Sequence, residues 1–252
     1  MRANFPSDAE PWYALSRRGQ VFVLTMQRDD NRFDFESTAA LHAALDKVEQ
    51  TVKQEDPKLK QPWALVTTGH ERIYSNGLDP IKVFPSMPDF CGKLYHPLLK
   101  RMLTFPMPTV AAINGHAFAG GCMFAMAHDY RVMRSDRGFI CMNEIDMKVP
   151  LTPGMVSIVR AKFPSPKLVH ACLLEAHRFD AKQALATGLI DQVAEPEKVV
   201  DTAVALAEHW APKGRAGPVM SMIKSDVYPD AVRALTSGGL GHVATFKPNF
   251  KL

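Results

Sequence analysis

The feature that most constrains the fold is a long stretch without charge, Met102–His128, which contains no Asp, Glu, Lys or Arg. Its length would suit a membrane-spanning helix. However, helix-breaking residues interrupt it repeatedly, at Pro106, Pro108, Asn114-Gly115 and Gly120-Gly121. A buried strand, a turn and a buried helix of a globular core tolerate such breaks better than a helix in lipid does. We therefore expect no membrane span.

The composition is that of a globular protein. The chain has 252 residues, of which 46% are hydrophobic and 22% are charged, enough for one large domain or one domain with an appendage. Thirty Lys and Arg against 26 Asp and Glu give a net charge of +4, an excess too small to indicate nucleic-acid binding. The four cysteines form no C-x-x-C pair, which favours reduced intracellular thiols, and no secretory signal is recognisable in Met1–Arg18.

Strands and helices alternate in the first part of the chain. Hydrophobic periodicity and turn residues predict the order strand, strand, helix, strand, helix, strand, helix, strand over Trp12–Ser16, Val21–Met26, Glu36–Gln54, Trp63–Thr67, Phe90–Leu103, Thr109–Ile113, Cys122–His128 and Tyr130–Met133. Ser37 or Thr38 is the expected cap of the first helix. This alternation indicates an α/β fold with parallel strands covered by helices.

The pattern becomes mainly helical after Pro153. One short strand, Leu189–Val193, interrupts helices predicted over Pro153–Phe163, Pro166–Leu174, Asp180–Thr187, Glu197–Trp210 and Gly217–Val227. We therefore divide the chain into an α/β core, residues 1–164, and a helical carboxyl-terminal region, residues 165–252. The glycine-rich Gly238–Gly241 and the segment Lys247–Leu252 are expected to form a flexible tail.

Several kinds of site lack their sequence signatures. There is no H-E-x-x-H and no Cys/His cluster at ligand spacing, so a metal site is not expected. Ser75 lacks the leading glycine of a G-x-S-x-G hydrolase motif. The segment Gly115–Gly120 has phosphate-loop spacing without the lysine that must follow, and no G-x-G-x-x-G follows the first strand. These absences disfavour hydrolase, nucleotide-hydrolysing and dinucleotide-binding functions.

Three segments remain as candidates for a site. Tyr74–Asp79 and Asn114–Cys122 contain glycines that allow sharp turns and can present backbone N–H groups. Glu144 lies among apolar residues in Phe139–Ile145, where burial would raise its pKa toward that of a useful base. Taken singly, each has a simpler explanation, namely a turn, tight packing or a half-exposed strand. Their combination favours a catalytic site.

These segments resemble the crotonase, or enoyl-CoA hydratase/isomerase, superfamily. The resemblance extends from Val21 to about Val193 and is strongest in Ser75–Asp79, Pro108–Ala117, Gly120–Cys122 and Asp180–Asp191. It implies a spiral of ββα repeats with a helical carboxyl-terminal region that forms trimers, often paired into hexamers. It also implies an acyl-CoA thioester substrate, whose carbonyl oxygen would be held in an oxyanion hole by the N–H groups of Leu78 and Gly120.

The departures from the family pattern bear on the reaction. Hydratases of the family hold a water between two glutamates; the position of the first is Met123 here, and Glu144 matches the second. A single base beside an oxyanion hole is the pattern of Δ3,Δ2-enoyl-CoA isomerases, and the Asn143–Asp146 context looks most like the plant peroxisomal isomerases. The resemblance thus implies that Glu144 moves the proton as a 3-enoyl-CoA becomes a 2-trans-enoyl-CoA in unsaturated fatty acid β-oxidation.

The remaining site assignments concern substrate binding. Residues expected to contact the substrate are Ser75, Asn76, Gly77, Met123 and Phe118, with Phe84–Met87 also along the acyl channel. Candidates for the CoA phosphates are Arg28, Arg32 and Lys82. No metal and no cofactor is expected, because CoA belongs to the substrate.

Two other functions stay open. A hydratase would need a second acid, for which Asp79 and Asp146 are the stand-ins, and a non-catalytic homologue would bind acyl-CoA without turnover. The terminal Phe250-Lys251-Leu252 is similar to the peroxisomal address S-K-L, apart from the phenylalanine. A peroxisomal location is therefore expected, with the cytoplasm as the alternative.

Overall fold

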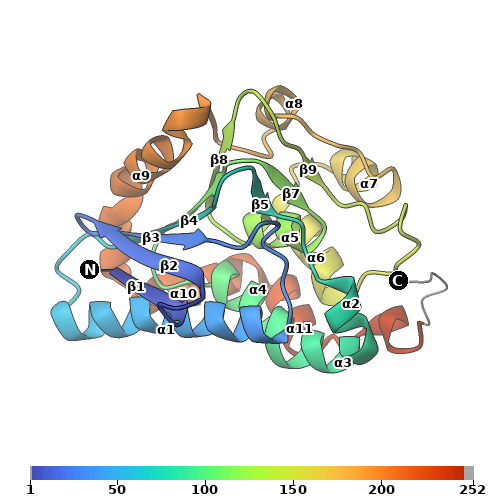
Figure 1. Cartoon of the computed structure of the whole chain (residues 1–252), viewed down its shortest axis with the longest axis horizontal. Coiled ribbons are helices and arrows are strands. Elements are labelled where there is room, and N and C mark those ends of the chain that lie inside the picture. The colour runs from blue at the N-terminus through green and yellow to red at the C-terminus, as the bar shows by residue number, and fades with distance from the viewer. Residues whose placement is uncertain (1, 247–252) are drawn as a thin grey trace.

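Two β-sheets form the centre of the molecule, for which a computed structural model describes residues 2–246 (Figure 1). The larger sheet has the order β1-β2-β3-β4-β6-β8-β10. Its strands are β1 (Arg2–Pro6), β2 (Pro11–Arg18), β3 (Val21–Met26), β4 (Ala64–Gly69), β6 (Thr109–Ile113), β8 (Tyr130–Arg134) and β10 (Gln192–Ala194). The first three strands pair antiparallel, and the pairs from β3 onward are parallel.

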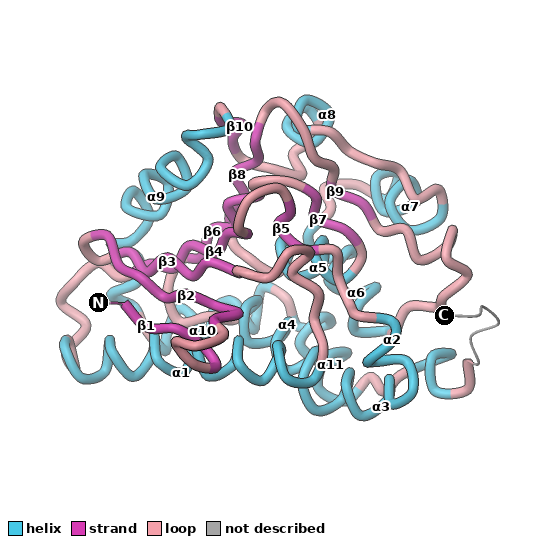
Figure 2. Tube along the Cα trace, in the orientation of Figure 1, coloured by secondary structure: helices cyan, strands magenta, loops and turns pink. Residues whose placement is uncertain are grey.

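A second, smaller sheet lies beside the first, as Figure 2 shows. It has the order β5-β7-β9, with β5 (Ile73–Ser75), β7 (His116–Phe118) and β9 (Ile140–Cys141) in parallel. Each of these strands follows a strand of the large sheet along the chain and is itself followed by a helix. The chain thus makes three successive ββα turns, which confirms the expected spiral of ββα repeats.

Helices cover the sheets. They are α1 (Phe35–Glu55), α2 (Pro80–Val83), α3 (Met87–Phe90), α4 (His96–Leu103), α5 (Gly120–Met126), α6 (Pro153–Lys162), α7 (Pro166–Leu174), α8 (Ala181–Ala186), α9 (Val199–Trp210), α10 (Pro218–Val227) and α11 (Pro229–Ser237). In Figure 1, α9 and α1 lie on opposite sides of the large sheet. The inner face of α9 buries Ala203 and Ala207 against Val66 and Val110 of the sheet, in a core separate from the main one.

The long first helix begins differently from the prediction. Its cap is Asp34, rather than Ser37 or Thr38, and the helix starts at Phe35. The Asp34 carboxylate accepts a hydrogen bond from the Ser37 amide at 2.7 Å, and the Ser37 hydroxyl accepts one from the Asp34 amide at 2.8 Å. This reciprocal capping box satisfies two amides that would otherwise lack partners, and it makes Ser37 the third residue of the helix.

The helix predicted over Phe90–Leu103 is broken. Between α3 and α4 the chain widens into a π-helical turn, Cys91–Tyr95, in which the His96 amide donates to the Cys91 carbonyl five residues earlier. Proline has no amide hydrogen, and its ring clashes with the carbonyl four residues before it in a regular α-helix. Pro97 therefore accounts for the wider turn at this point.

Short elements escaped the sequence analysis. Strands β1, β5, β7 and β9 and helix α11 were not predicted. The flexible tail expected from Gly238 is wrong at Gly241–Ala244, which forms a 3-10 turn with Val243 buried against the core. The rest of that tail, Lys247–Leu252, lies outside the described residues. The division of the chain at residue 164 stays a prediction, although β10 returns from the second part to pair with β8.

The charge-free stretch forms the end of α4, then β6, β7 and α5, as expected for a buried strand, turn and helix. Among residues 2–246, no helix is both long enough and apolar enough to cross a membrane. All four cysteines are buried and unpaired.

A buried lysine connects the last quarter of the chain to the core. The ammonium group of Lys224, on α10, donates to the carbonyls of Phe105 and Met107 at 3.0 and 3.1 Å. It also pairs with the Asp129 carboxylate at 2.6 Å. These contacts satisfy the charge of a side chain that is 10% exposed, and they attach α10 to the turn before β6.

Candidate active site

The three segments selected from the sequence meet at one cavity of about 380 Å³. The small sheet brings them together, because β5, β7 and β9 are parallel neighbours and each segment includes residues of one of these strands. The cavity is lined by Asn76, Leu78, Phe118, Gly120, Met123 and Glu144, among others. Ser75 and Gly77, which were also expected to contact the substrate, are not among the residues that line it.

Glu144 carries the only carboxylate among the lining residues of this cavity. It lies in a turn after β9, closed by a hydrogen bond from the Val149 amide to its own carbonyl at 2.9 Å. The residue is 8% exposed, and its Oε2 atom is buried without a hydrogen-bond partner among the described residues. Burial raises the pKa of Glu144 to about 7, against a smaller lowering by its own backbone amide. The half-exposed strand considered as an alternative is therefore wrong.

The backbone at Leu78 turns its N–H away from Phe33, the residue with which it pairs. Leu78 forms a parallel bridge with Phe33, in which the Phe33 amide donates to the Gly77 carbonyl and the Asp79 amide donates to the Phe33 carbonyl. Successive peptide groups of an extended chain point in opposite directions. The Leu78 N–H thus points away from Phe33, and it donates no hydrogen bond to any described residue.

The N–H of Gly120 is presented at the start of α5. Ala119 precedes it with φ 50° and ψ −122°, a conformation that a side chain disfavours. This geometry is held by hydrogen bonds from the Ala119 amide to Cys141 O, at 2.8 Å, and from the Met123 amide to Ala119 O, at 3.1 Å. The first N–H groups of a helix lack partners within the helix, and that of Gly120 has none elsewhere in residues 2–246.

The two amides lie close together. A Cβ atom placed on Gly77 would be 2.7 Å from the Gly120 nitrogen, and one placed on Gly120 would be 3.0 Å from Cδ2 of Leu78. Gly77 also has φ +83°, so only glycine fits there without strain. Ser75 supports this turn from behind, since its hydroxyl donates to Asn31 O at 2.7 Å and accepts from the Gly77 amide at 3.1 Å.

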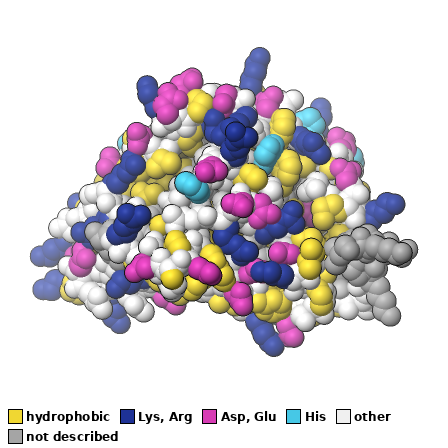
Figure 3. Space-filling view, in the orientation of Figure 1, with side chains coloured by type: hydrophobic (Ala, Val, Ile, Leu, Met, Phe, Trp, Pro, Cys, Tyr) yellow, Lys and Arg dark blue, Asp and Glu magenta, His cyan; other side chains and the backbone are white. Residues whose placement is uncertain are grey.

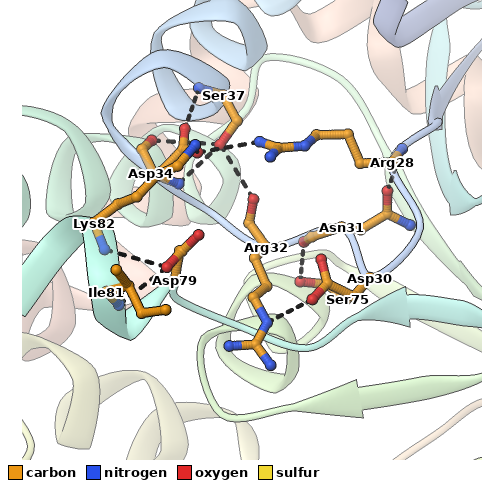
Figure 4. A network of polar contacts seen from close by, with 10 residues as sticks. All are labelled: Arg28, Asp30, Asn31, Arg32, Asp34, Ser37, Ser75, Asp79, Ile81 and Lys82. Atoms are coloured by element: carbon orange, nitrogen blue, oxygen red, sulfur yellow. Dashed lines mark hydrogen bonds and ion pairs between the residues drawn. The ribbon is translucent and has the colours of Figure 1, made fainter. Parts of the chain in front are cut away.

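A polar network anchors the Leu78 segment (Figure 4). The buried carboxylate of Asp34 pairs with Arg28 at 3.1 Å and with Lys82 at 2.7 Å. Burial alone would raise the pKa of Asp34, but hydrogen bonds from Lys82, Ser37 and Arg28 outweigh it and lower the pKa to about 2. Of the three basic residues proposed for the CoA phosphates, Arg28 and Lys82 are thus engaged in this network, and only Arg32 lines the cavity.

Apolar side chains form most of the remaining wall. Met123 lies in the cavity, as do Phe84 and Met87, which were expected along an acyl channel. The two stand-ins for a second acid are elsewhere. Asp79 caps α2 by accepting hydrogen bonds from the Ile81 and Lys82 amides, and Asp146 is exposed on the Glu144 turn.

Three polar residues at the cavity escaped the sequence analysis. His116 and Asn143 line it, and their Nδ1 and Oδ1 atoms are buried without partners among the described residues. The guanidinium of Arg178 lies 5.8 Å from the centre of the Phe118 ring. His116 and Asn143 lie inside two of the segments selected from the sequence. A search of those segments for polar side chains without an assigned role would have identified them. Arg178 lies far along the chain, and nothing in the sequence connects it to the cavity. Across residues 2–246, no cluster of three potential His, Cys, Asp or Glu metal ligands occurs.

Comparison of the sequence with known proteins identifies the family to which the chain belongs. The family model described as enoyl-CoA hydratase/isomerase matches residues 16–244. Enoyl-CoA delta isomerase 3 of Arabidopsis thaliana is 35% identical over 87% of this chain and 93% of its own length. The peroxisomal enoyl-CoA delta isomerase 2 of the same plant is 30% identical, over 86% and 92%.

The fold agrees with that assignment. A Mycobacterium tuberculosis structure described as an enoyl-CoA isomerase superposes with a TM-score of 0.79 at 26% identity, covering 94% of this chain and 99% of the other. A structure from the same organism described as a probable enoyl-CoA hydratase superposes with a TM-score of 0.78 at 26% identity, covering 93% and 95%. The chain therefore has the crotonase fold and belongs to the enoyl-CoA hydratase/isomerase family of enzymes.

Proposed function

We propose that the protein is a Δ3,Δ2-enoyl-CoA isomerase, which moves the double bond of a 3-enoyl-CoA to the 2-trans position in the oxidation of unsaturated fatty acids. The observation that carries the proposal is a single buried carboxylate, Glu144, facing an apolar cavity that also receives two unpaired backbone amides. The Arabidopsis relatives named as enoyl-CoA delta isomerases support it.

The proposed reaction moves one proton between two carbons. Ionised Glu144 removes a proton from carbon 2 of the thioester, and the electron pair shifts to give a dienolate with its negative charge on the thioester oxygen. The N–H groups of Leu78 and Gly120 donate hydrogen bonds to that oxygen, each stabilising the transition state by about 3 kcal/mol. Glu144 then returns the same proton to carbon 4. The apolar wall keeps water from exchanging with that proton.

A hydratase has less support from this cavity. Addition of water requires a group that positions the water and transfers its proton, and a thioether can do neither. Met123 occupies the relevant wall, while Asp79 and Asp146 are engaged or exposed elsewhere. A single buried base suffices for isomerisation. Hydration would also need a second group to position the water and transfer its proton, and no second carboxylate among the described lining residues supplies it.

The direct test is conversion of trans-3-hexenoyl-CoA to the 2-enoyl product, with hydration of that product followed in the same cuvette. Glu144→Gln keeps the shape of the side chain but removes the base, so kcat is expected to fall by about 10³-fold. Asp146→Asn, an exposed carboxylate on the same turn, is the matched control and is expected to retain wild-type activity. Hydration by wild type would favour the hydratase, and tight binding of the ester without turnover would favour a non-catalytic acyl-CoA-binding protein.

The pH dependence offers a second check on Glu144. Because the base must be ionised, kcat/KM is expected to rise tenfold per pH unit below about 7, the pKa of Glu144, and to level off above it. The raised pKa also means that ionising Glu144 destabilises the folded state, with stability declining as the pH rises from 4.5 to about 7. Glu144→Gln is therefore expected to have a higher Tm than wild type at pH 8 while losing activity.

Basic groups near the cavity are proposed to bind the CoA phosphates. Arg32 lines the cavity, and Arg178 lies against Phe118 at its wall. Burial of His116, a lining residue, lowers its pKa, and the positive charges of Arg178 and Arg137 lower it further. We therefore assign the phosphates to Arg32 and Arg178 in preference to Arg28 and Lys82.

Figure 3 shows basic and acidic side chains interspersed over the visible face.

A homotrimer, or a hexamer of two trimers, is also part of the proposal. Helix α10 leaves a row of apolar side chains exposed, namely Val219 (55%), Met222 (65%), Ile223 (57%) and Val227 (59%). An exposed row of this kind is characteristic of an interface. Light scattering is expected to give a trimeric or hexameric mass for wild type and a smaller one for Met222→Glu.

Peroxisomal location and independence of added cofactors complete the proposal. Two of the Arabidopsis relatives are named as peroxisomal, whereas the name of the third carries no location. Colocalisation of a tagged full chain with a peroxisomal marker tests the location, against the cytoplasm. Since the proton moves between the substrate and Glu144, dialysis against a chelator is expected to leave the activity unchanged.

A further inference from the structure

A tyrosine that contacts the Gly120 backbone lies behind the cavity wall. The hydroxyl of Tyr95 donates to the carbonyl oxygen of Gly120 at 2.6 Å. A Cβ on Gly120 would lie 2.8 Å from the same hydroxyl, so the two residues are in tight contact. Tyr95 is fully buried, is absent from the cavity lining and therefore has no direct access to a ligand there.

The position of Tyr95 depends on the π-helical turn. Tyr95 is the last residue of that turn, immediately before α4. The extra residue in a π turn rotates the side chains after it relative to a regular helix, and such turns are frequent at functional sites. Two aromatic rings then hold the side chain, Phe90 stacked at 5.9 Å and Phe33 tilted at 5.7 Å between ring centres. The hydroxyl consequently has little freedom to leave the Gly120 carbonyl.

Gly120 needs such an external restraint. Glycine has the freest backbone of all residues, and here it follows Ala119, whose φ of 50° is itself disfavoured. The hydrogen bonds of Ala119 fix the chain before Gly120, and the Tyr95 bond fixes the carbonyl after it. The peptide carrying the Gly120 N–H is thus restrained on both sides.

We propose that Tyr95 is a positioning residue that holds the Gly120 N–H in the direction required to stabilise the thioester oxygen. This inference rests on the proposed function and adds a residue to its machinery. Tyr95 stays neutral throughout, since burial raises its pKa well above the ordinary value and the negative charge of Glu144 raises it further. It acts through the Gly120 backbone and transfers no proton to the substrate.

The test compares two buried tyrosines. Tyr95→Phe removes only the hydroxyl that contacts Gly120. Tyr74→Phe is the matched control, because Tyr74 is also fully buried and its hydroxyl bonds to the Thr67 side chain at 2.8 Å, away from the cavity lining. Both variants are expected to lose similar thermal stability. Only Tyr95→Phe is expected to lower kcat, by about tenfold, with KM changed less than twofold and the pH midpoint unchanged.

A spectroscopic readout separates this inference from the proposed function. The carbonyl stretching frequency of bound hexanoyl-CoA, which is not turned over, reports the strength of the hydrogen bonds to the thioester oxygen. It is expected to shift less from its value in water with Tyr95→Phe than with wild type or Tyr74→Phe. Equal kcat losses in the two variants, or equal carbonyl frequencies, would overturn the inference. Absence of isomerisation by wild type, with the frequency difference intact, would overturn only the proposed reaction.

A pair of variants provides a check that does not depend on the phenylalanine variant alone. Gly120→Ala brings a methyl group against the Tyr95 hydroxyl, so its loss of activity is expected to be several-fold smaller in the Tyr95→Phe background. Strictly additive effects would contradict a direct action of Tyr95 on Gly120.

Discussion

The two sides of the cavity present the same chemical group, a backbone N–H, but different interactions hold them. The Leu78 side is anchored by charge, through the buried Asp34 with its partners Arg28 and Lys82. The Gly120 side is anchored by uncharged groups, through hydrogen bonds of Ala119 and of the Tyr95 hydroxyl and through packing against aromatic residues of the main core. Although both sides offer the same N–H group, we expect activity to depend on different substitutions at each. Removal of a charge should affect the Leu78 side, and a change in side-chain volume should affect the Gly120 side.

Among substitutions that perturb the support of the two amides, the largest effect is expected where the two sides touch. A Cβ on Gly121 would lie 2.2 Å from the Ser75 carbonyl oxygen, so Gly121→Ala must push α5 away from β5. We expect destabilisation by about 3 kcal/mol and a fall in kcat of about 100-fold, because both amides move. Chemical denaturation and steady-state kinetics measure the two effects.

Gly92→Ala is the control for this substitution. Gly92 lies in the π-helical turn, and a Cβ there would meet no described atom within 4 Å. Alanine is expected to leave activity unchanged and stability equal or slightly higher. If Gly121→Ala behaved in the same way, the contact between the two sides would not matter for function.

A smaller effect is expected from Asp34→Asn, which tests the charged side alone. The pKa of Asp34 is lowered from 3.8 to about 2, so its ionisation stabilises the folded state by about 2 kcal/mol above pH 4. That stability is lost as the pH falls from 3.8 through 2, and the asparagine variant should lack it at neutral pH. Because the network holds the Leu78 segment, we also expect kcat to fall by about fivefold.

Asp56 offers a matched comparison at the other end of α1. Its buried carboxylate accepts hydrogen bonds from the Lys60 and Gln61 amides and from Trp63, with no contact to the cavity. Asp56→Asn is expected to lose stability while retaining kcat. Equal kcat losses in Asp34→Asn and Asp56→Asn would indicate general loosening of the fold. The Asp34 network would then have no specific role in holding the Leu78 segment.

The smallest effect is expected from Arg32→Ala. The ion pair of Arg32 with Asp30 is partly exposed, with 37% and 41% of the two side chains accessible, and such pairs contribute about 0.5 kcal/mol or less. Stability should hardly change, whereas KM for the CoA ester should rise about threefold if Arg32 contacts a phosphate. Arg18→Ala, which removes an exposed pair with Asp201, should change neither quantity.

The sequence analysis succeeded where a signal is local and repeated. The long helix α1 follows a clear helical periodicity, the hairpin of β2 and β3 and strand β6 are short apolar runs beside turn residues, and resemblance supplied the spiral arrangement. Glu144 was selected for its apolar neighbours in combination with the two glycine-containing segments, and the structure confirms that it is buried with a raised pKa.

The missed features depend on contacts between distant segments. Strands of two or three residues, such as β9, are too short to show a period, yet the small sheet brings the site together. Ala119 adopts a positive φ that sequence would assign to glycine, because Cys141 and Met123 hold it in place. Tyr95 reaches Gly120 through a π turn, which changes the helical phase on which periodicity arguments depend.

The buried Lys224 has a consequence for synthesis on the ribosome. Its partners at Phe105 and Met107 lie 119 and 117 residues earlier in the chain. Contacts of such large sequence separation form late, because a long loop must close before they can contribute. Until α10 leaves the exit tunnel, the nascent chain must hold these carbonyls and Asp129 without their ammonium partner. The segment before β6 therefore reaches its final form only after α10 has been synthesised and has left the tunnel.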